Sequence, residues 1–152
     1  AIQRDGVPYD LISKSLPTVE GAVNDILAQI VDFSVVFSMN GKDIDTHIVY
    51  DDDRVWSLEL SSGMERFISS LAIRIGLMNV SNLPQSNFLA IDEGWGTMDS
   101  DNLNSVAQLF QYLKSQFQFT FVVSHIETMR DFVDTLLEIK KIDGSSSVRF
   151  SR

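Results

Sequence analysis

The stretch that decides the fold is Phe88-Leu89-Ala90-Ile91-Asp92-Glu93, in which four apolar residues run directly into two acids. A short, continuously apolar run is typical of a strand buried on both faces of a parallel sheet. In open α/β sheets, ligands bind beyond the carboxyl ends of the strands, which is where the two acids stand. The stretch predicts a buried strand ending at a binding site, while a solvated loop explains the acids alone equally well.

A second apolar run, residues 119–123, ends in Ser124-His125. Between the two runs, apolar residues at helical spacing predict an amphipathic helix: Leu103, Val106, Leu109, Phe110 and Leu113. Strand, helix and strand joined by short connections favour parallel strands. Parallel strands would bring Asp92, Glu93 and His125 to one crevice. That position gives His125 more weight than a lone histidine carries, since a lone histidine is more often a packed or surface residue.

The residues before the first run show helix and strand patterns in turn. Apolar spacing predicts a short helix over 9–14, a longer helix after Pro17 and another over 63–78. Strand patterns cover residues 33–37, 47–50 and 55–60, and Asn40-Gly41 between the first two is a strong hairpin signal. Asp143-Gly144 predicts a second hairpin near the end of the chain.

Ser62-Gly63-Met64-Glu65 stands at the start of the helix predicted over 63–78. Ser-x-x-Glu before an apolar periodic run is a capping box, which is the simpler explanation of these residues. A second explanation is compatible with the first. A helix N-terminus that is opened by glycine and carries a serine hydroxyl is also a natural contact for phosphate.

Gly94-Trp95-Gly96-Thr97-Met98-Asp99 joins the two acids to the next helix. Its glycines allow backbone conformations that are closed to other residues. Asp99 or Ser100 is explained as well by capping of the helix that follows as by a role in a site.

Composition limits the class of protein. The 152 residues, 44% hydrophobic and 22% charged, indicate one globular domain or one lobe of a larger one, and a chain that starts at Ala1 suggests a fragment. No run approaches the roughly 20 apolar residues of a membrane span. The lack of Cys excludes disulfides and thiolate metal sites. The net charge of −9 argues against a broad DNA-binding surface on this segment, but not against a local basic patch.

In this order, Ser61-Ser62-Gly63-Met64-Glu65, residues 88–93 and Ser124-His125 resemble the signature motif, Walker B strand and switch histidine of the ABC superfamily. Residues 6–152 look most like the C-terminal ATPase lobe of the SMC and SbcC-type DNA-repair ATPases. The resemblance implies an α/β fold for residues 1–152 as a single domain: the C-terminal lobe of a P-loop NTPase head, with parallel core strands flanked by helices and added β-hairpins. The family signature Leu-Ser-Gly-Gly-Glu has its leucine replaced by Ser61 and its second glycine by Met64.

The resemblance implies a role for each matched residue. Asp92 would hold Mg²⁺ through water, Glu93 would activate the hydrolytic water, and His125 would be the switch histidine. Ser62, Gly63 and Glu65 would be nucleotide-binding residues of the signature motif, and Ser62 would face the γ-phosphate of ATP bound mainly by a second head. Asp99 would belong to the D-loop, which crosses the dimer interface. Arg66 and Arg74 match basic positions that relay the nucleotide state to lobe movement, although two ordinary exposed arginines explain them as well.

The phosphate-binding pattern Gly-x-x-x-x-Gly-Lys-Ser/Thr is nowhere in this sequence. In the family layout that Walker A loop lies in an N-terminal lobe, separated from this one by a long coiled coil. The resemblance therefore implies an ATPase half-site that needs the other lobe, ATP and Mg²⁺. It also implies a homodimer of heads, an SbcD-type nuclease and DNA as partners, no membrane, and a cytoplasmic, DNA-associated location (nucleoid or nucleus).

Two other interpretations stay open at this point. One keeps the ATPase fold in a RecF- or RecN-like protein or in the ATP-binding component of a transporter. The other is a non-catalytic assembly module in which the acids and serines are structural.

Overall fold

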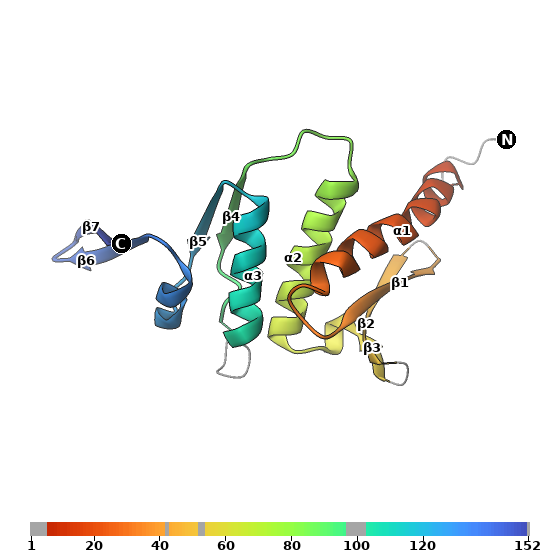
Figure 1. The fold of residues 1–152 in the computed structure, drawn as a ribbon, viewed down its shortest axis with the longest axis horizontal. Coiled ribbons are helices and arrows are strands. Elements are labelled where there is room, and N and C mark those ends of the chain that lie inside the picture. Colours follow the sequence, from red (N-terminus) through yellow and green to blue (C-terminus); the bar gives the residue numbers. More distant parts are fainter. Residues whose placement is uncertain (1–5, 42, 52–53, 97–102, 152) are drawn as a thin grey trace.

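The computed structural model of the protein describes residues 6–41, 43–51, 54–96 and 103–151. Along the chain it runs from a long helix through a three-stranded antiparallel sheet and a second helix to a parallel strand-helix-strand unit, and it ends in a hairpin (Figure 1). These elements make a mixed α/β fold, as the sequence predicted.

The parallel unit consists of β4 (Phe88–Asp92), α3 (Leu103–Gln116) and β5 (Phe119–Val123). The two strands pair in parallel from Phe88↔Phe119 to Asp92↔Val123, which confirms the predicted pairing. In Figure 1 both strands run downward, whereas α3 and α2 (Gly63–Val80) run upward. The carboxyl ends of the strands and the N-termini of both helices therefore lie toward the same end of the molecule.

The expectation that both faces of these strands are buried is wrong for this chain. Alternation along β4 buries Ile91, but Phe88 is 50% exposed, and its cross-strand neighbour Phe119 is 58% exposed. The two exposed rings stack on each other with centroids 5.6 Å apart. One face of the parallel sheet packs against the core. The other face, which also carries Phe121 and Val123, is exposed, and none of the described residues covers it, so we call it the bare face.

The antiparallel sheet has the order β1 (Ser34–Asn40), β2 (Asp43–Asp51), β3 (Arg54–Ser57). The hairpin predicted at Asn40-Gly41 is confirmed, and Gly41 takes a positive φ of 63° that suits glycine. The third strand is shorter than predicted. Residues Leu58–Leu60 form the 3₁₀ helix η1 instead, because the Ser61 hydroxyl and backbone amide both bond the carbonyl of Leu58.

The first helix, α1 (Gly6–Leu27), is a single element with Pro17 inside it, rather than two helices separated at the proline. Two of its polar side chains hold the edge strand β1. The Asn24 amide both donates to and accepts from the backbone of Val35, and Glu20 accepts from the backbone N–H of Phe37 at 2.7 Å. These bonds satisfy an edge that would otherwise present unpaired backbone groups.

One apolar core joins α1, the inner side of the antiparallel sheet, α2 and α3. The helices α1 and α2 approach each other at Gly76, where a Cβ atom would lie only 2.8 Å from Cγ2 of Val23. The core thus packs α2, whose N-cap is Ser62, between the antiparallel sheet and the parallel unit.

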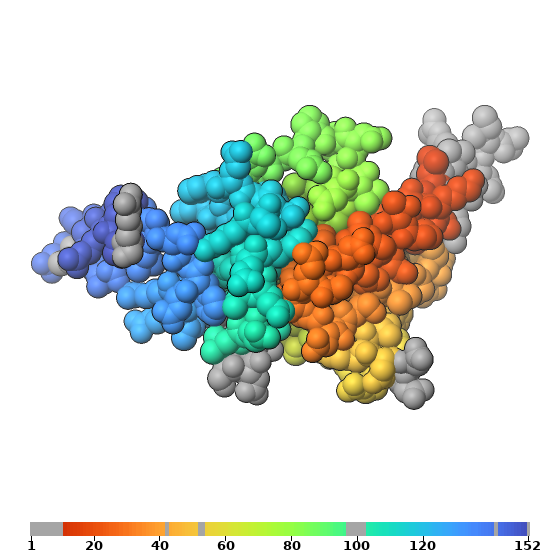
Figure 2. Space-filling view, in the orientation of Figure 1, coloured from red at the N-terminus to blue at the C-terminus, as the bar shows by residue number. Residues whose placement is uncertain are grey.

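The final hairpin, β6 (Leu136–Ile142) and β7 (Ser145–Ser151), confirms the turn predicted at Asp143-Gly144. It extends from the body at the end opposite α1 (Figure 2). Its register puts four exposed apolar side chains on one face: Leu137, Ile139, Val148 and Phe150. This face is a second apolar surface that no described residue covers. A two-stranded hairpin is only marginally stable by itself.

In the part of the chain that the structure describes, no helix is both long enough and apolar enough to traverse a bilayer.

Candidate functional site

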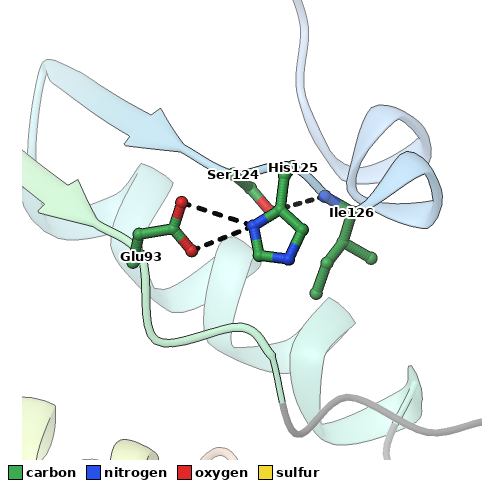
Figure 3. Close-up of polar contacts among 4 residues, drawn as sticks. All are labelled: Glu93, Ser124, His125 and Ile126. Atoms are coloured by element: carbon green, nitrogen blue, oxygen red, sulfur yellow. Dashed lines mark hydrogen bonds and ion pairs between the residues drawn. The ribbon is translucent and has the colours of Figure 1, made fainter.

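The candidate site is built on a pair formed by Glu93 and His125. Nδ1 of His125 lies 3.1 Å from Oε2 and 3.3 Å from Oε1 of Glu93, so the ring nitrogen faces the whole carboxylate (Figure 3). Both side chains are exposed. The pair sits where β4 and β5 end side by side, because the parallel register places Asp92 opposite Val123.

The backbone around the pair is held on both sides. The N–H of Glu93 donates to the carbonyl of Val123 at 3.1 Å, which extends the ladder one residue beyond β4. Glu93 itself has a φ of 62°, in a region that side-chain-bearing residues rarely adopt. On the other strand, the Ser124 hydroxyl accepts the N–H of Ile126 at 3.1 Å and closes a tight turn around His125 (Figure 3). Strained backbone of this kind persists where the surrounding structure imposes it.

The contact has a consequence for the histidine tautomer. A carboxylate only accepts hydrogen bonds, so Nδ1 must carry a proton toward Glu93. The other ring nitrogen, Nε2, points away from Glu93 (Figure 3). It is an acceptor in the neutral ring and a donor in the imidazolium. A neutral His125 can therefore donate to a phosphate through Nε2 only after the bond to Glu93 is released.

Asp92 is the last residue of β4, and its side chain is exposed beside the pair's strand ends. Within the described residues, no three His, Cys, Asp or Glu side chains are grouped to enclose a metal ion. A single exposed carboxylate is nonetheless the donor that suits Mg²⁺, which keeps several waters and is completed by substrate phosphates rather than by a protein cage.

Ser62 and Glu65 form a complete capping box at the start of α2. The Ser62 hydroxyl accepts the N–H of Glu65 at 3.2 Å, and a Glu65 carboxylate oxygen accepts the N–H of Ser62 at 2.6 Å. In the first of these bonds the hydroxyl oxygen of Ser62 is the acceptor. Ser62 is exposed and Gly63 follows as the first helical residue, whereas Met64, which replaces the second signature glycine, is buried in the core.

A residue that the sequence did not single out completes this cap. The Tyr50 hydroxyl, on β2, donates to Oε1 of Glu65 at 2.5 Å. Burial, and after it the hydrogen bond and charge of Glu65, raise the pKa of Tyr50 to about 12. Burial also raises the pKa of Glu65, but the bonds from Tyr50 and Ser62 outweigh it and hold that pKa below its usual value. An aromatic residue in a strand is ordinary, so no sequence signal marked Tyr50.

The other predicted site residues are dispersed. Arg66 and Arg74 are exposed on α2, and Arg66 donates to the carbonyl of Glu59 at 3.4 Å. Asp99 lies outside the described residues. The structure thus brings together Asp92, Glu93 and His125 at the strand ends, and Ser62, Gly63 and Glu65 at a helix start.

No protein-family model matches the chain. An uncharacterized protein of Acanthamoeba polyphaga mimivirus, R555, is 34% identical over 160 residues, covering 95% of this chain and 12% of that protein. The SbcC component of the nuclease SbcCD from Staphylococcus aureus is 29% identical over 123 residues, covering 78% of this chain and 12% of that protein. The chain spans about 12% of the length of the curated relatives that it matches.

Solved structures agree on the fold. A chain from a structural study of ATP-driven dimerization and DNA-stimulated activation of SMC ATPases has a TM-score of 0.74 at 17% identity, covering 94% of this chain and 89% of that one. The SMC head domain from Thermotoga maritima has a TM-score of 0.64 at 20% identity, covering 96% and 52%. The Smc head domain from Pyrococcus furiosus, bound to the C-terminal domain of ScpA, has a TM-score of 0.67 at 19% identity. This match covers 93% of this chain and 36% of that one. These likenesses confirm the predicted fold.

Proposed function

We propose that this chain, a C-terminal lobe of the SMC/SbcC-like ATPase kind, supplies the water-activating and signature residues of a composite ATP site. The observation that carries the proposal is the contact between Glu93 and His125 at the ends of two parallel strands. Hydrolysis of a phosphoanhydride requires a group that orients and deprotonates water, and another that bonds the γ-phosphate. The contact between the two side chains supports this division of tasks.

In the proposed site, Glu93 accepts the proton of the attacking water, and His125 orients the carboxylate and bonds the phosphate once its ring is released or doubly protonated. Asp92 would hold Mg²⁺ through water, and the ion would neutralise phosphate charge. The exposure of all three side chains is consistent with a site that is completed by other groups.

Another segment of the same protein would complete the site. The sequence lacks a phosphate-binding loop, and the curated relatives are far longer than this chain. The bare face of β4 and β5 carries stacked Phe88 and Phe119, which fits an apolar surface of an N-terminal Walker A lobe. Burying such rings is favourable by about 25 cal/mol per Å² of apolar surface, so this face would drive docking of that lobe.

The capped start of α2 would serve a second copy. In a dimer of heads, the Ser62 hydroxyl and the helix N-terminus at Gly63 would face the γ-phosphate held by the partner head, and Glu65 would hold this cap in place. ATP would close the dimer and hydrolysis would open it. Arg66 and Arg74 would relay that change along α2, and Asp99 would contribute from the D-loop. The S. aureus relative is named as part of a nuclease, so an SbcD-type nuclease and DNA are the proposed partners.

The experiment is steady-state ATP hydrolysis by the full-length parent protein and by this chain alone. The parent protein should turn over ATP, Glu93→Gln should abolish turnover while ATP still supports dimers, and this chain alone should give only background. If this chain is instead a non-catalytic assembly module, Glu93→Gln should change neither the ATP turnover nor the dimerisation of the full-length protein.

A further inference from the structure

A row of four aromatic rings runs behind the candidate site. Neighbouring ring centroids lie 4.6 Å apart between Phe67 and Trp95, 5.4 Å between Trp95 and Phe110, and 5.7 Å between Phe110 and Phe132. We call these four residues the aromatic row. Spacings of this size are those of directly packed aromatic pairs.

Each ring of the row comes from a different element. Phe67 belongs to the first turns of α2, the helix that Ser62 caps, and Phe110 lies in α3. Trp95 follows Glu93 by two positions, and Phe132 ends η3 (Glu127–Phe132), the 3₁₀ helix that follows His125 and Ile126. The row therefore anchors the three segments that carry the candidate site's motifs.

Of the four residues, Trp95 is the one nearest in sequence to Glu93, and it is 0% exposed. Its indole Nε1 has no hydrogen-bond partner among the described residues. A buried donor without a partner is unfavourable, so packing rather than hydrogen bonding accounts for this residue. The indole packs directly against Phe67 and Phe110, and side chains packed in a protein interior cannot shift without disturbing their neighbours.

The backbone between Glu93 and Trp95 is pressed against the same row. Gly94 has a φ of 102°, and a Cβ atom there would lie 2.5 Å from Cε2 of Phe67. With Glu93 also at positive φ, the chain turns sharply and returns Trp95 into the core. The orientation of the Glu93 side chain at the end of β4 thus depends on the position of the Trp95 indole in the core.

We infer that Trp95 is a positioning residue for the proposed ATPase, holding the carboxylate of Glu93 in register with His125 and with the helix capped by Ser62. The inference rests on the proposed function. Misplacing a catalytic group by about 1 Å costs roughly 100-fold in rate. Loosening the packing of Trp95 should therefore lower the rate of the chemical step more than the affinity for nucleotide.

The test measures kcat, KM for ATP and the melting temperature of the full-length protein carrying Trp95→Ala, Trp95→Phe or Leu113→Ala. Leu113 is the matched control, because it is fully buried on α3 but lies outside the aromatic row. Trp95→Ala should lower kcat roughly 10- to 100-fold with KM changed less than about threefold. Trp95→Phe keeps a ring and removes the unpaired donor, so it should restore kcat to within about threefold of the natural protein.

Leu113→Ala should lower the melting temperature as Trp95→Ala does, yet leave kcat within about twofold. The inference is overturned if Trp95→Ala keeps its kcat, or if Leu113→Ala loses as much kcat at equal loss of melting temperature. If Trp95→Ala is insoluble, Phe67→Leu replaces it. This variant should also lose kcat with little change in KM, and the same two results would overturn the inference.

The same assay separates this inference from the proposed function. If the natural full-length protein hydrolyses no ATP, or Glu93→Gln hydrolyses as fast as the natural protein, the proposed function fails. If Glu93→Gln abolishes turnover while Trp95→Ala does not lower it, the positioning role alone fails.

Discussion

Nδ1 of His125 lies 3.1 Å from Oε2 of Glu93, although the two residues stand 32 positions apart in the chain. The contact follows from the parallel register of β4 and β5, from the extra ladder bond made by the Glu93 backbone, and from the turn closed by Ser124. The backbone thus places both side chains, and their contact does not depend on a buried environment.

Replacing His125 by Ala tests that contact. Turnover of the full-length protein should fall roughly 100-fold or more, because removing one preorganised hydrogen-bond donor to the reacting phosphate costs about that factor. The melting temperature should change little, since an exposed pair adds little stability. His47→Ala, the other histidine of the chain, is the control and should keep its turnover. Equal losses in the two variants would rule out a specific role for His125.

Ser62 can be tested for capping and phosphate contact separately. Ser62→Asp keeps an N-cap acceptor, whereas Ser62→Ala loses it and should cost about 1 kcal/mol of folding free energy. The aspartate would repel a γ-phosphate, so Ser62→Asp should fold as stably as the natural protein yet lose ATP-dependent dimerisation, read by gel filtration with ATP. If Ser62→Asp still forms ATP-dependent dimers, Ser62 caps the helix and does not contact phosphate.

Tyr50→Phe removes the hydroxyl that bonds Glu65 and should destabilise the chain by about 0.5–1.5 kcal/mol in urea unfolding. A double-mutant cycle with Glu65→Ala, which removes the acceptor, isolates the coupling between the two side chains. A coupling energy near zero would mean that the bond contributes nothing to the start of α2.

The burial of Tyr50, together with its bond to Glu65, predicts that stability depends on alkaline pH. The native pKa of Tyr50, about 12, lies above the ordinary value of 10.0, so the native state holds this proton more tightly. The resulting stability is complete below pH 10 and is lost as the pH rises toward 12. Urea unfolding over that window should show a loss in the natural chain that is absent from Tyr50→Phe. Parallel losses in the two chains would contradict the prediction.

Gly94→Ala tests the sharp turn after Glu93. The added Cβ would meet Phe67 at 2.5 Å in a left-handed backbone, so unfolding free energy should fall by roughly 1–3 kcal/mol. Gly96→Ala is the matched control, because no atom of the described residues lies within 4 Å of its Cβ position. If both variants are equally stable, the packing of this turn on α2 is not as described.

Much of the fold could be predicted because its signals are local. Asn40-Gly41 specifies a hairpin, Ser62 and Glu65 specify a helix start, and two apolar runs specify the parallel pair. The juxtaposition of Glu93 and His125 was predictable for the same reason, since parallel strands end at a common edge.

What could not be predicted depends on tertiary contacts. Pro17 was expected to separate two helices, but α1 continues through it, and its Glu20 and Asn24 bind β1. The burial of Trp95 and the bond from Tyr50 need partners that are remote in sequence. The bare face of the parallel sheet could not be foreseen from an apolar run, which looks alike whether one face is covered or two.

The central claim is that this lobe contributes water activation to a site whose triphosphate is held elsewhere. Steady-state ATP hydrolysis by the full-length protein, its Glu93→Gln variant and this chain alone tests it most directly. We expect turnover in the first, none in the second despite ATP-dependent dimers, and background in the third. Full turnover by this chain alone, or by Glu93→Gln in the full-length protein, would contradict the account.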